Sequence, residues 1–171
     1  MTYCHPANAK LKDQDLFRDF TEAELDELLE LSEPRLFSAG RKIVVQGEMG
    51  HSMFLLTEGR ARGVLHQPDG LEIEVARFAV GDIFGELALL DRQPRTADVV
   101  AVTDCMVMTV TTGLMRMLGE SSPRAAFKLA MAVLELAGGR LRVANQRYVD
   151  SLNIVSALSA GVTVMTEEQA A

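Results

Sequence analysis

Glycine-marked turns divide the middle of this chain into short β-rich runs. Between residues 35 and 111, these runs are separated by Gly40, Gly47, Gly50, Gly59, Gly70 and Gly81. Turns that recur about every 8–12 residues are typical of an antiparallel sandwich or barrel. Asp69-Gly70, between residues 60–67 and 71–79, is a strong signal for a hairpin. We therefore predict an antiparallel, jelly-roll-like β-roll over residues 35–111.

The segment before the roll, residues 1–34, shows a helical pattern. Thr21 and Glu24 form a capping-box pattern ahead of leucines that share one helical face. Pro34 should end that helix, because a proline disfavours helical geometry in the residue before it.

The segment after the roll is also predicted to be helical, over residues 112–152. Thr112 can cap a short helix, and Ser122-Pro123 fits the N-cap and first position of a long helix that runs to about Leu152. The tail, residues 153–171, has no clear assignment. The expected fold class is α+β, with N-terminal helices, a β-roll that includes one short helix, and a long C-terminal helix.

Composition narrows the classes of function. The chain is 48% hydrophobic and 24% charged, which is typical of a soluble globular protein. Its net charge of −7 disfavours binding to the phosphate backbone of DNA. No apolar run reaches the roughly 18 residues that span a bilayer, and no signal-peptide pattern begins the chain. We expect a cytoplasmic protein without membrane contact.

Catalytic and metal-binding patterns are not evident. Cys4 and Cys105 match no metal motif. The three histidines (His5, His51 and His66) are scattered along the chain, and no nucleophile–base pair stands out. We therefore expect neither an enzyme nor a metal protein.

Residues 84–97 combine features that suit a phosphorylated sugar. Gly85 permits close backbone approach at the start of a short helix, whose first N–H groups lack internal partners and favour an anion. Arg95 offers a planar fork that suits a phosphodiester, and Glu86 can accept hydrogen bonds from sugar hydroxyls. An ordinary Glu–Arg ion pair at a strand–helix corner is the alternative.

The string from Phe84 to Ala97 resembles the phosphate-binding cassette of the cyclic-nucleotide-binding domain family. That family includes kinase regulatory subunits, gated ion channels and bacterial catabolite-activator regulators. The resemblance covers roughly residues 16–152 and includes early strand motifs at 37–40 and 46–56. His51 departs from the family pattern, which often has Asp or Glu there, and Asp98 is also unusual.

The resemblance implies roles for individual residues. Glu86 corresponds to the acceptor for the ribose 2′-hydroxyl and Arg95 to the phosphate-binding arginine. Val75 corresponds to an apolar wall near the base. The expected binding set in the cassette is Phe84, Gly85, Glu86, Leu87, Ala88, Arg95, Thr96 and Ala97.

The identity of the base is less constrained. In the family, a Thr at the position of Thr96 can hydrogen-bond guanine, and cGMP-selective members often carry it. Some cAMP-binding members also carry Thr or Ser there. The resemblance implies cAMP or cGMP as the ligand, with cAMP ranked first by its frequency in the family.

The long helix carries a heptad pattern over residues 123–152. Large residues recur every seventh position at Phe127, Leu134, Leu141 and Tyr148, and small ones three positions later at Ala130, Ala137, Ala144 and Ser151. This pattern predicts a homodimer through paired helices, although one stripe packed on the roll is the alternative. Further base contacts are expected from Asn145, by family alignment, or from Arg142.

These features together predict a stand-alone sensor. A bound cyclic nucleotide would move the C-terminal helix and so regulate an unknown effector protein. Residues 153–171 contain no Lys or Arg, so direct DNA binding is not expected. The alternatives are a catabolite-activator-type regulator that lacks its own DNA-binding domain, and a retained fold with an altered ligand.

Overall fold

The computed structural model describes residues 8–168, with side chains described at residue 8 and over residues 10–157. The chain divides after Val133 into two compact units, which we describe separately. The division falls within the last helix. Among the described residues, no helix combines the length and the apolar character needed to cross a membrane.

The first unit begins with α1 (Asn8–Lys12), the 3-10 turn η1 (Asp15–Phe17) and α2 (Glu22–Leu31). The predicted capping box is confirmed. The Glu24 N–H donates to Thr21 Oγ1 at 3.3 Å, and the Thr21 N–H donates to Glu24 Oε2 at 2.8 Å. Helix α2 ends before Pro34, as predicted, and the following strand begins at Glu33.

Two antiparallel sheets form the roll, which confirms the predicted fold class. The strands over residues 8–168 are β1 (Glu33–Phe37), β2 (Lys42–Val44), β3 (Ser52–Glu58), β4 (Ala61–His66), β5 (Glu72–Phe78), β6 (Ile83–Phe84), β7 (Asp98–Ala101) and β8 (Cys105–Thr111). Their orders are β1-β8-β3-β6 and β2-β7-β4-β5. Pro34 lies in the edge strand β1, where its missing N–H is tolerated.

The hairpin predicted at Asp69-Gly70 joins β4 to β5. Gly70 has φ +85°, a left-handed conformation that favours glycine. Its N–H donates to the Gln67 carbonyl at 2.9 Å, and Asp69 Oδ1 accepts the Leu71 N–H at 3.0 Å. The sequence signal and the turn geometry therefore agree.

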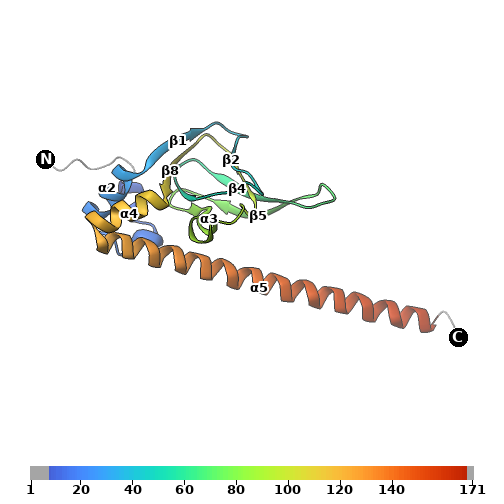
Figure 1. Ribbon diagram of the computed structural model, residues 1–171. Helices are drawn as coiled ribbons and strands as arrows, with labels where there is room; N and C mark the ends of the chain where they lie inside the picture. The colour runs from blue at the N-terminus through green and yellow to red at the C-terminus, as the bar shows by residue number, and fades with distance from the viewer. Residues whose placement is uncertain (1–7, 169–171) are drawn as a thin grey trace. The chain divides into compact units, whose positions relative to one another are not determined.

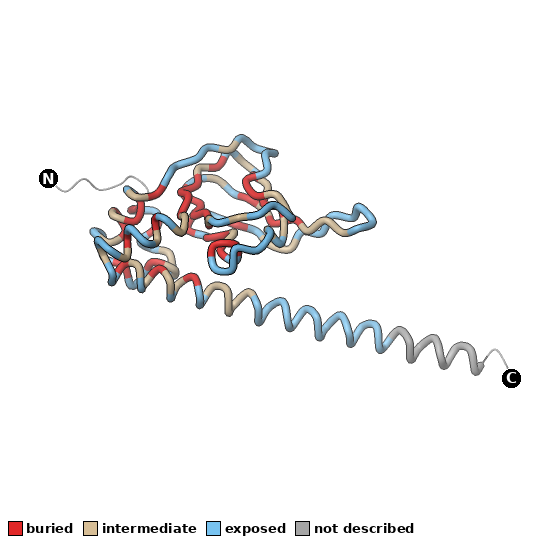
Figure 2. Tube along the Cα trace, viewed as in Figure 1, coloured by how far each residue is buried: buried red, intermediate tan, exposed pale blue. Residues whose placement is uncertain are grey.

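The core lies between the two sheets and is mainly aliphatic, with three phenylalanines in contact. The ring of Phe84 lies 5.6 Å from that of Phe54 and 5.0 Å from that of Phe78, measured between centroids. Figure 2 shows that buried residues follow the strands and the helices beside them. Phe84, at the end of β6, thus ties the start of the cassette to the core.

Helix α4 (Thr112–Ser121) follows β8 directly, and the predicted cap is wrong by one residue. Thr111, not Thr112, is the N-cap, and its Oγ1 accepts the Leu114 N–H at 3.1 Å. Strand β8 continues to Thr111, which places the next residue inside the helix. Figure 1 shows α2 and α4 together at one end of the sheets.

Helix α5 (Pro123–Glu168) starts at the predicted proline and continues well past Leu152. It therefore includes most of the tail that sequence patterns left unassigned. Within the first unit, Ala125, Leu129 and Val133 are buried, and Lys128 forms an ion pair with Glu24 of α2. These contacts hold the first turns of α5 to the N-terminal helices.

Candidate functional site

The cassette is a sharp corner between β6 and the helix α3 (Glu86–Asp91). Gly85 precedes the helix with φ +74° and ψ 13°, a left-handed conformation that favours glycine. Glu86 is the first helical residue and is buried, at 4% exposure. The helix ends at Asp91, and its C-cap residue Arg92 is also left-handed, at φ +56°. The corner brings residues 84–88 close to Arg95.

Arg95 is held from two directions by main-chain oxygens. Its Nη1 donates to the carbonyl of Ser52 and to the carbonyl of Gly85, both at 2.7 Å. Its Nη2 donates to Ser52 Oγ at 3.2 Å. The guanidinium carbon lies 5.5 Å from the centroid of the Phe54 ring. The orientation of the guanidinium is therefore set before any ligand is present.

Among the residues that the structure describes, no direct ion pair balances the charge of Arg95. In the part of the chain that the structure describes, its hydrogen-bond partners are neutral and no carboxylate forms a salt bridge with it. Burial lowers the pKa of Arg95, and the nearby charge of Glu86 opposes that effect. Arginine nonetheless remains protonated in proteins. The corner thus presents a fixed, half-buried cation that can bind an anion.

Gly85 is required for space as well as for conformation. A Cβ at this residue would lie 2.6 Å from Arg95 Nη1 and 3.4 Å from Arg95 Cζ. Real side chains do not approach so closely, so the guanidinium would have to move. Gly85, which belongs to the predicted binding set, therefore also makes room for the guanidinium of Arg95.

The other predicted cassette residues vary in exposure. Phe84 and Ala88 are buried, Ala97 is half-buried, and Leu87 and Thr96 are exposed. Thr96, which follows Arg95, is therefore not part of the hydrophobic core. The structure thus brings Gly85, Glu86 and Arg95 together, while the ligand-binding role of each residue in the set stays a prediction.

The predicted base contacts lie in different parts of the chain. Val75 is half-buried on β5, in the first unit. Arg142 and Asn145 are exposed residues of α5 in the second unit. Their contacts with a base remain predictions.

Sequence patterns missed the residues that hold Arg95 and the segment beside it. Ser52 and Phe54 both come from β3, more than forty positions earlier in the chain. A motif confined to residues 84–97 does not identify them. In the sequence, the available signal is a serine directly before the apolar run of residues 53–56.

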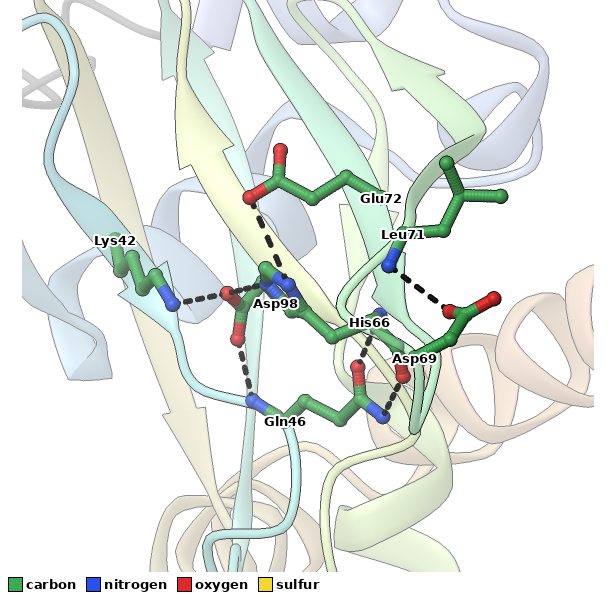
Figure 3. A network of polar contacts seen from close by, with 7 residues as sticks. All are labelled: Lys42, Gln46, His66, Asp69, Leu71, Glu72 and Asp98. Carbon is green, nitrogen blue, oxygen red and sulfur yellow. Dashed lines mark hydrogen bonds and ion pairs between the residues drawn. The ribbon is translucent and has the colours of Figure 1, made fainter.

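A second polar cluster, centred on Asp98, lies beside the cassette (Figure 3). Asp98 is 1% exposed, and its carboxylate forms an ion pair with Lys42. Its Oδ2 lies 2.6 Å from His66 Nε2, and its Oδ1 accepts the Gln46 N–H at 2.6 Å. His66 Nδ1 in turn lies 3.6 Å from Glu72 Oε1. Asp98 was noted in the sequence only as unusual.

The pKa of Asp98 reflects two opposed effects. Burial raises the pKa of the carboxyl group, while the hydrogen bonds from Lys42, the Gln46 N–H and His66 lower it, and the net shift is downward. The carboxylate is therefore stabilised in its charged form.

Comparison with known families identifies the family to which the chain belongs. The family model described as "Cyclic nucleotide-binding domain" matches residues 34–122, which include nearly all of both sheets and the whole cassette. The chain belongs to this family. The resemblance inferred from residues 84–97 is therefore confirmed.

Members of the family with different overall functions are similar to this chain. A cyclic nucleotide-gated potassium channel of Rhizobium etli is 33% identical over 124 residues, covering 72% of this chain and 33% of the channel. A cAMP-dependent protein kinase regulatory subunit of Colletotrichum orbiculare is 36% identical over 110 residues, covering 64% of this chain and 27% of that subunit. The chain therefore matches about a third or less of the length of these relatives.

A solved structure shows the same fold. The catabolite activator protein of Thermus thermophilus superposes with a TM-score of 0.73 at 29% identity, covering 82% of this chain and 63% of that one. The chain is thus similar both to a kinase regulatory subunit and to a catabolite activator protein.

Proposed function

We propose that this chain binds a cyclic nucleotide at the cassette and acts as a non-catalytic sensor. In this proposal, Arg95 binds the cyclic phosphate and Glu86 accepts a hydrogen bond from the ribose 2′-hydroxyl. The observation that supports the proposal most is the fixed orientation of the Arg95 side chain and its lack of a direct ion pair among the described residues. The guanidinium is oriented by Ser52 and Gly85.

Either cAMP or cGMP fits this site, and we rank cAMP first. Relatives named for cAMP, such as the kinase regulatory subunit of Colletotrichum orbiculare, support that order. The exposed Thr96 beside Arg95 supports cGMP as the alternative, because its hydroxyl can hydrogen-bond a guanine. Neither Arg95 nor Glu86 distinguishes the two bases.

The output of the sensor is proposed to be a movement of the C-terminal helix that regulates a partner protein. A ligand shifts such an equilibrium only by its different affinities for the two helix positions. The similarity to a catabolite activator protein favours a second candidate, a transcription regulator of the catabolite-activator type.

Calorimetric titration with cAMP and cGMP tests the binding proposal. Arg95→Ala should weaken binding at least tenfold, because a charge-assisted hydrogen bond to phosphate is lost. Arg92→Ala is the matched control, since it removes an exposed arginine of the same cassette. Equal affinities for wild type and Arg95→Ala would overturn the role of Arg95. No binding of either nucleotide by the wild type would indicate a retained fold with an altered ligand.

We also propose a homodimer through residues 123–152. The large heptad residues Phe127, Leu134, Leu141 and Tyr148 are all exposed in the single chain, which supports pairing of two helices. Sedimentation at low concentration should find a dimer that Leu141→Lys dissociates. Gln146→Lys, on the outer face of the same helix, should leave it intact. A monomeric wild type would contradict the proposal.

A further inference from the structure

We propose that Asp98 is a positioning residue of the phosphate site, which acts by holding the loop of residues 46–50 against Arg95. This inference rests on the proposed binding function, and it assigns a role to a residue outside the predicted binding set. Asp98 does not contact the guanidinium itself. It acts through the main chain of a loop that Arg95 also uses.

Asp98 fixes the beginning of the loop. The Gln46 N–H donates to Asp98 Oδ1 at 2.6 Å, a short bond to a charged acceptor. The Gln46 side chain bonds in both directions with the main chain of His66, accepting its N–H at 2.8 Å and donating to its carbonyl at 3.3 Å. Residue 46 is thereby tied to strands β4 and β7 at once.

The same loop fixes the backbone of Arg95. The Gly47 N–H donates to the Arg95 carbonyl, and the Arg95 N–H donates to the Glu48 carbonyl, at 2.9 and 2.8 Å. Met49 then forms a β-bridge with Pro94. The loop therefore connects the carboxylate of Asp98 to both sides of the phosphate-binding arginine.

The other groups around Asp98 explain why its orientation is fixed. Lys42 and His66 both contact Oδ2, which leaves Oδ1 directed at the Gln46 N–H. Figure 3 shows Asp98 between these residues. Because the carboxylate is 1% exposed, water does not replace a lost partner easily. Removing the carboxylate therefore leaves the Gln46 N–H unpaired and releases the start of the loop.

Nucleotide binding tests the role of Asp98 through Arg95. Asp98→Ala should weaken cAMP binding by about tenfold, the effect of one charge-assisted hydrogen bond. Asp104→Ala is the matched control, because Asp104 Oδ1 also accepts a distant main-chain N–H, that of Ala39, at 2.9 Å. It should change the affinity less than about twofold. In an Arg95→Ala background, Asp98→Ala should weaken cAMP binding little further. The reason is that the effects of two substitutions are not additive when one residue acts through the other.

Hydrogen exchange of the ligand-free protein separates this inference from the binding function. Asp98→Ala should speed exchange at the amides of Gly47 and Arg95, while the Gly70 amide in the β4–β5 turn serves as an unaffected reference. If the wild type binds no cyclic nucleotide but this exchange pattern is found, the binding proposal fails, while the part of the inference in which Asp98 holds the loop against Arg95 stands. Unchanged exchange at both amides would overturn the inference. Asp98→Asn replaces Asp98→Ala if the alanine variant does not fold.

Discussion

The guanidinium of Arg95 occupies the space that a side chain at Gly50 would need. A Cβ built on Gly50 would lie 2.5 Å from Arg95 Nε, 2.6 Å from Arg95 Cζ and 2.9 Å from the Cβ of Ala88. Gly50 does not have a positive φ, so its backbone conformation is open to other residues. The requirement for glycine at this position is therefore one of space beside the arginine.

Gly50→Ala should weaken cyclic-nucleotide binding by about tenfold, because overpacking of this size costs on the order of 1–3 kcal/mol and Arg95 is the group that has to move. Calorimetry with cAMP checks the affinity, and thermal unfolding checks that the variant is folded. Gly119→Ala in α4 is the control, since a Cβ there meets no atom within 4 Å. An unchanged affinity in Gly50→Ala would show that Arg95 tolerates displacement.

Thr96→Ala should lower the affinity for cGMP by about tenfold and change that for cAMP by less than about twofold. The reason is that the exposed hydroxyl beside Arg95 can accept a hydrogen bond from the 2-amino group of guanine, and adenine has no amino group at that position. Calorimetric titrations of wild type and variant with both nucleotides measure the ratio of the cGMP affinity to the cAMP affinity. Equal losses for the two nucleotides would mean that Thr96 contacts the shared ribose-phosphate instead.

Asp98→Asn should lower the free energy of unfolding at neutral pH by roughly 2 kcal/mol, the value of a hydrogen bond to a charged group. The pKa of Asp98 is lowered from its ordinary value of 3.8, so its contribution is present above that value and is lost as the pH falls through the lower folded pKa. The difference between wild type and variant should therefore shrink below about pH 4. Urea denaturation at a series of pH values measures it, and a difference independent of pH would contradict this assignment.

The ion pair between Glu24 and Lys128 should stabilise the contact of α2 with α5. Both side chains are largely buried, at 12% and 14% exposure, and the Lys128 ammonium also lies 5.7 Å from the centroid of the Phe20 ring. Lys128→Met should cost about 3 kcal/mol, because it leaves a buried carboxylate without its cation.

A double-mutant cycle isolates that interaction. Lys128→Met combined with Glu24→Gln should cost clearly less than the sum of the two single changes. Denaturant unfolding of the four proteins provides the measurement. Additive costs would show that Glu24 acts only through its capping box with Thr21.

Much of the fold was predictable because it depends on local patterns. Asp69-Gly70 specified the β4–β5 hairpin, and Thr21 with Glu24 specified the start of α2. The cap of α4 was misplaced because Thr111 and Thr112 are both suitable caps, and only the length of β8 decides between them. The predicted end of α5 was too early. The helix continues past Leu152 because no proline follows Pro123 to stop it.

The site was only partly predictable, for a physical reason. Gly85, Glu86 and Arg95 fall within one short motif, so their proximity follows from the corner they share. Ser52 and Gln46 reach the site through strand pairing and loop contacts across more than forty positions. The periodicity of a sequence does not reveal contacts between such distant residues. The burial of Asp98 was equally hard to predict, because the sequence shows only an acidic residue at the start of an apolar strand.

The contact between Arg95 and Phe54 changes how variants of this domain should be interpreted. Phe54 lies beneath the guanidinium and also stacks on Phe84, so one ring belongs both to the proposed binding site and to the hydrophobic core. In a mutational scan scored by ligand binding, Phe54 should rank with the cassette residues through its contact with Arg95. Conversely, a stability screen would select against the same substitutions, so the two maps of sensitive positions should overlap at this ring.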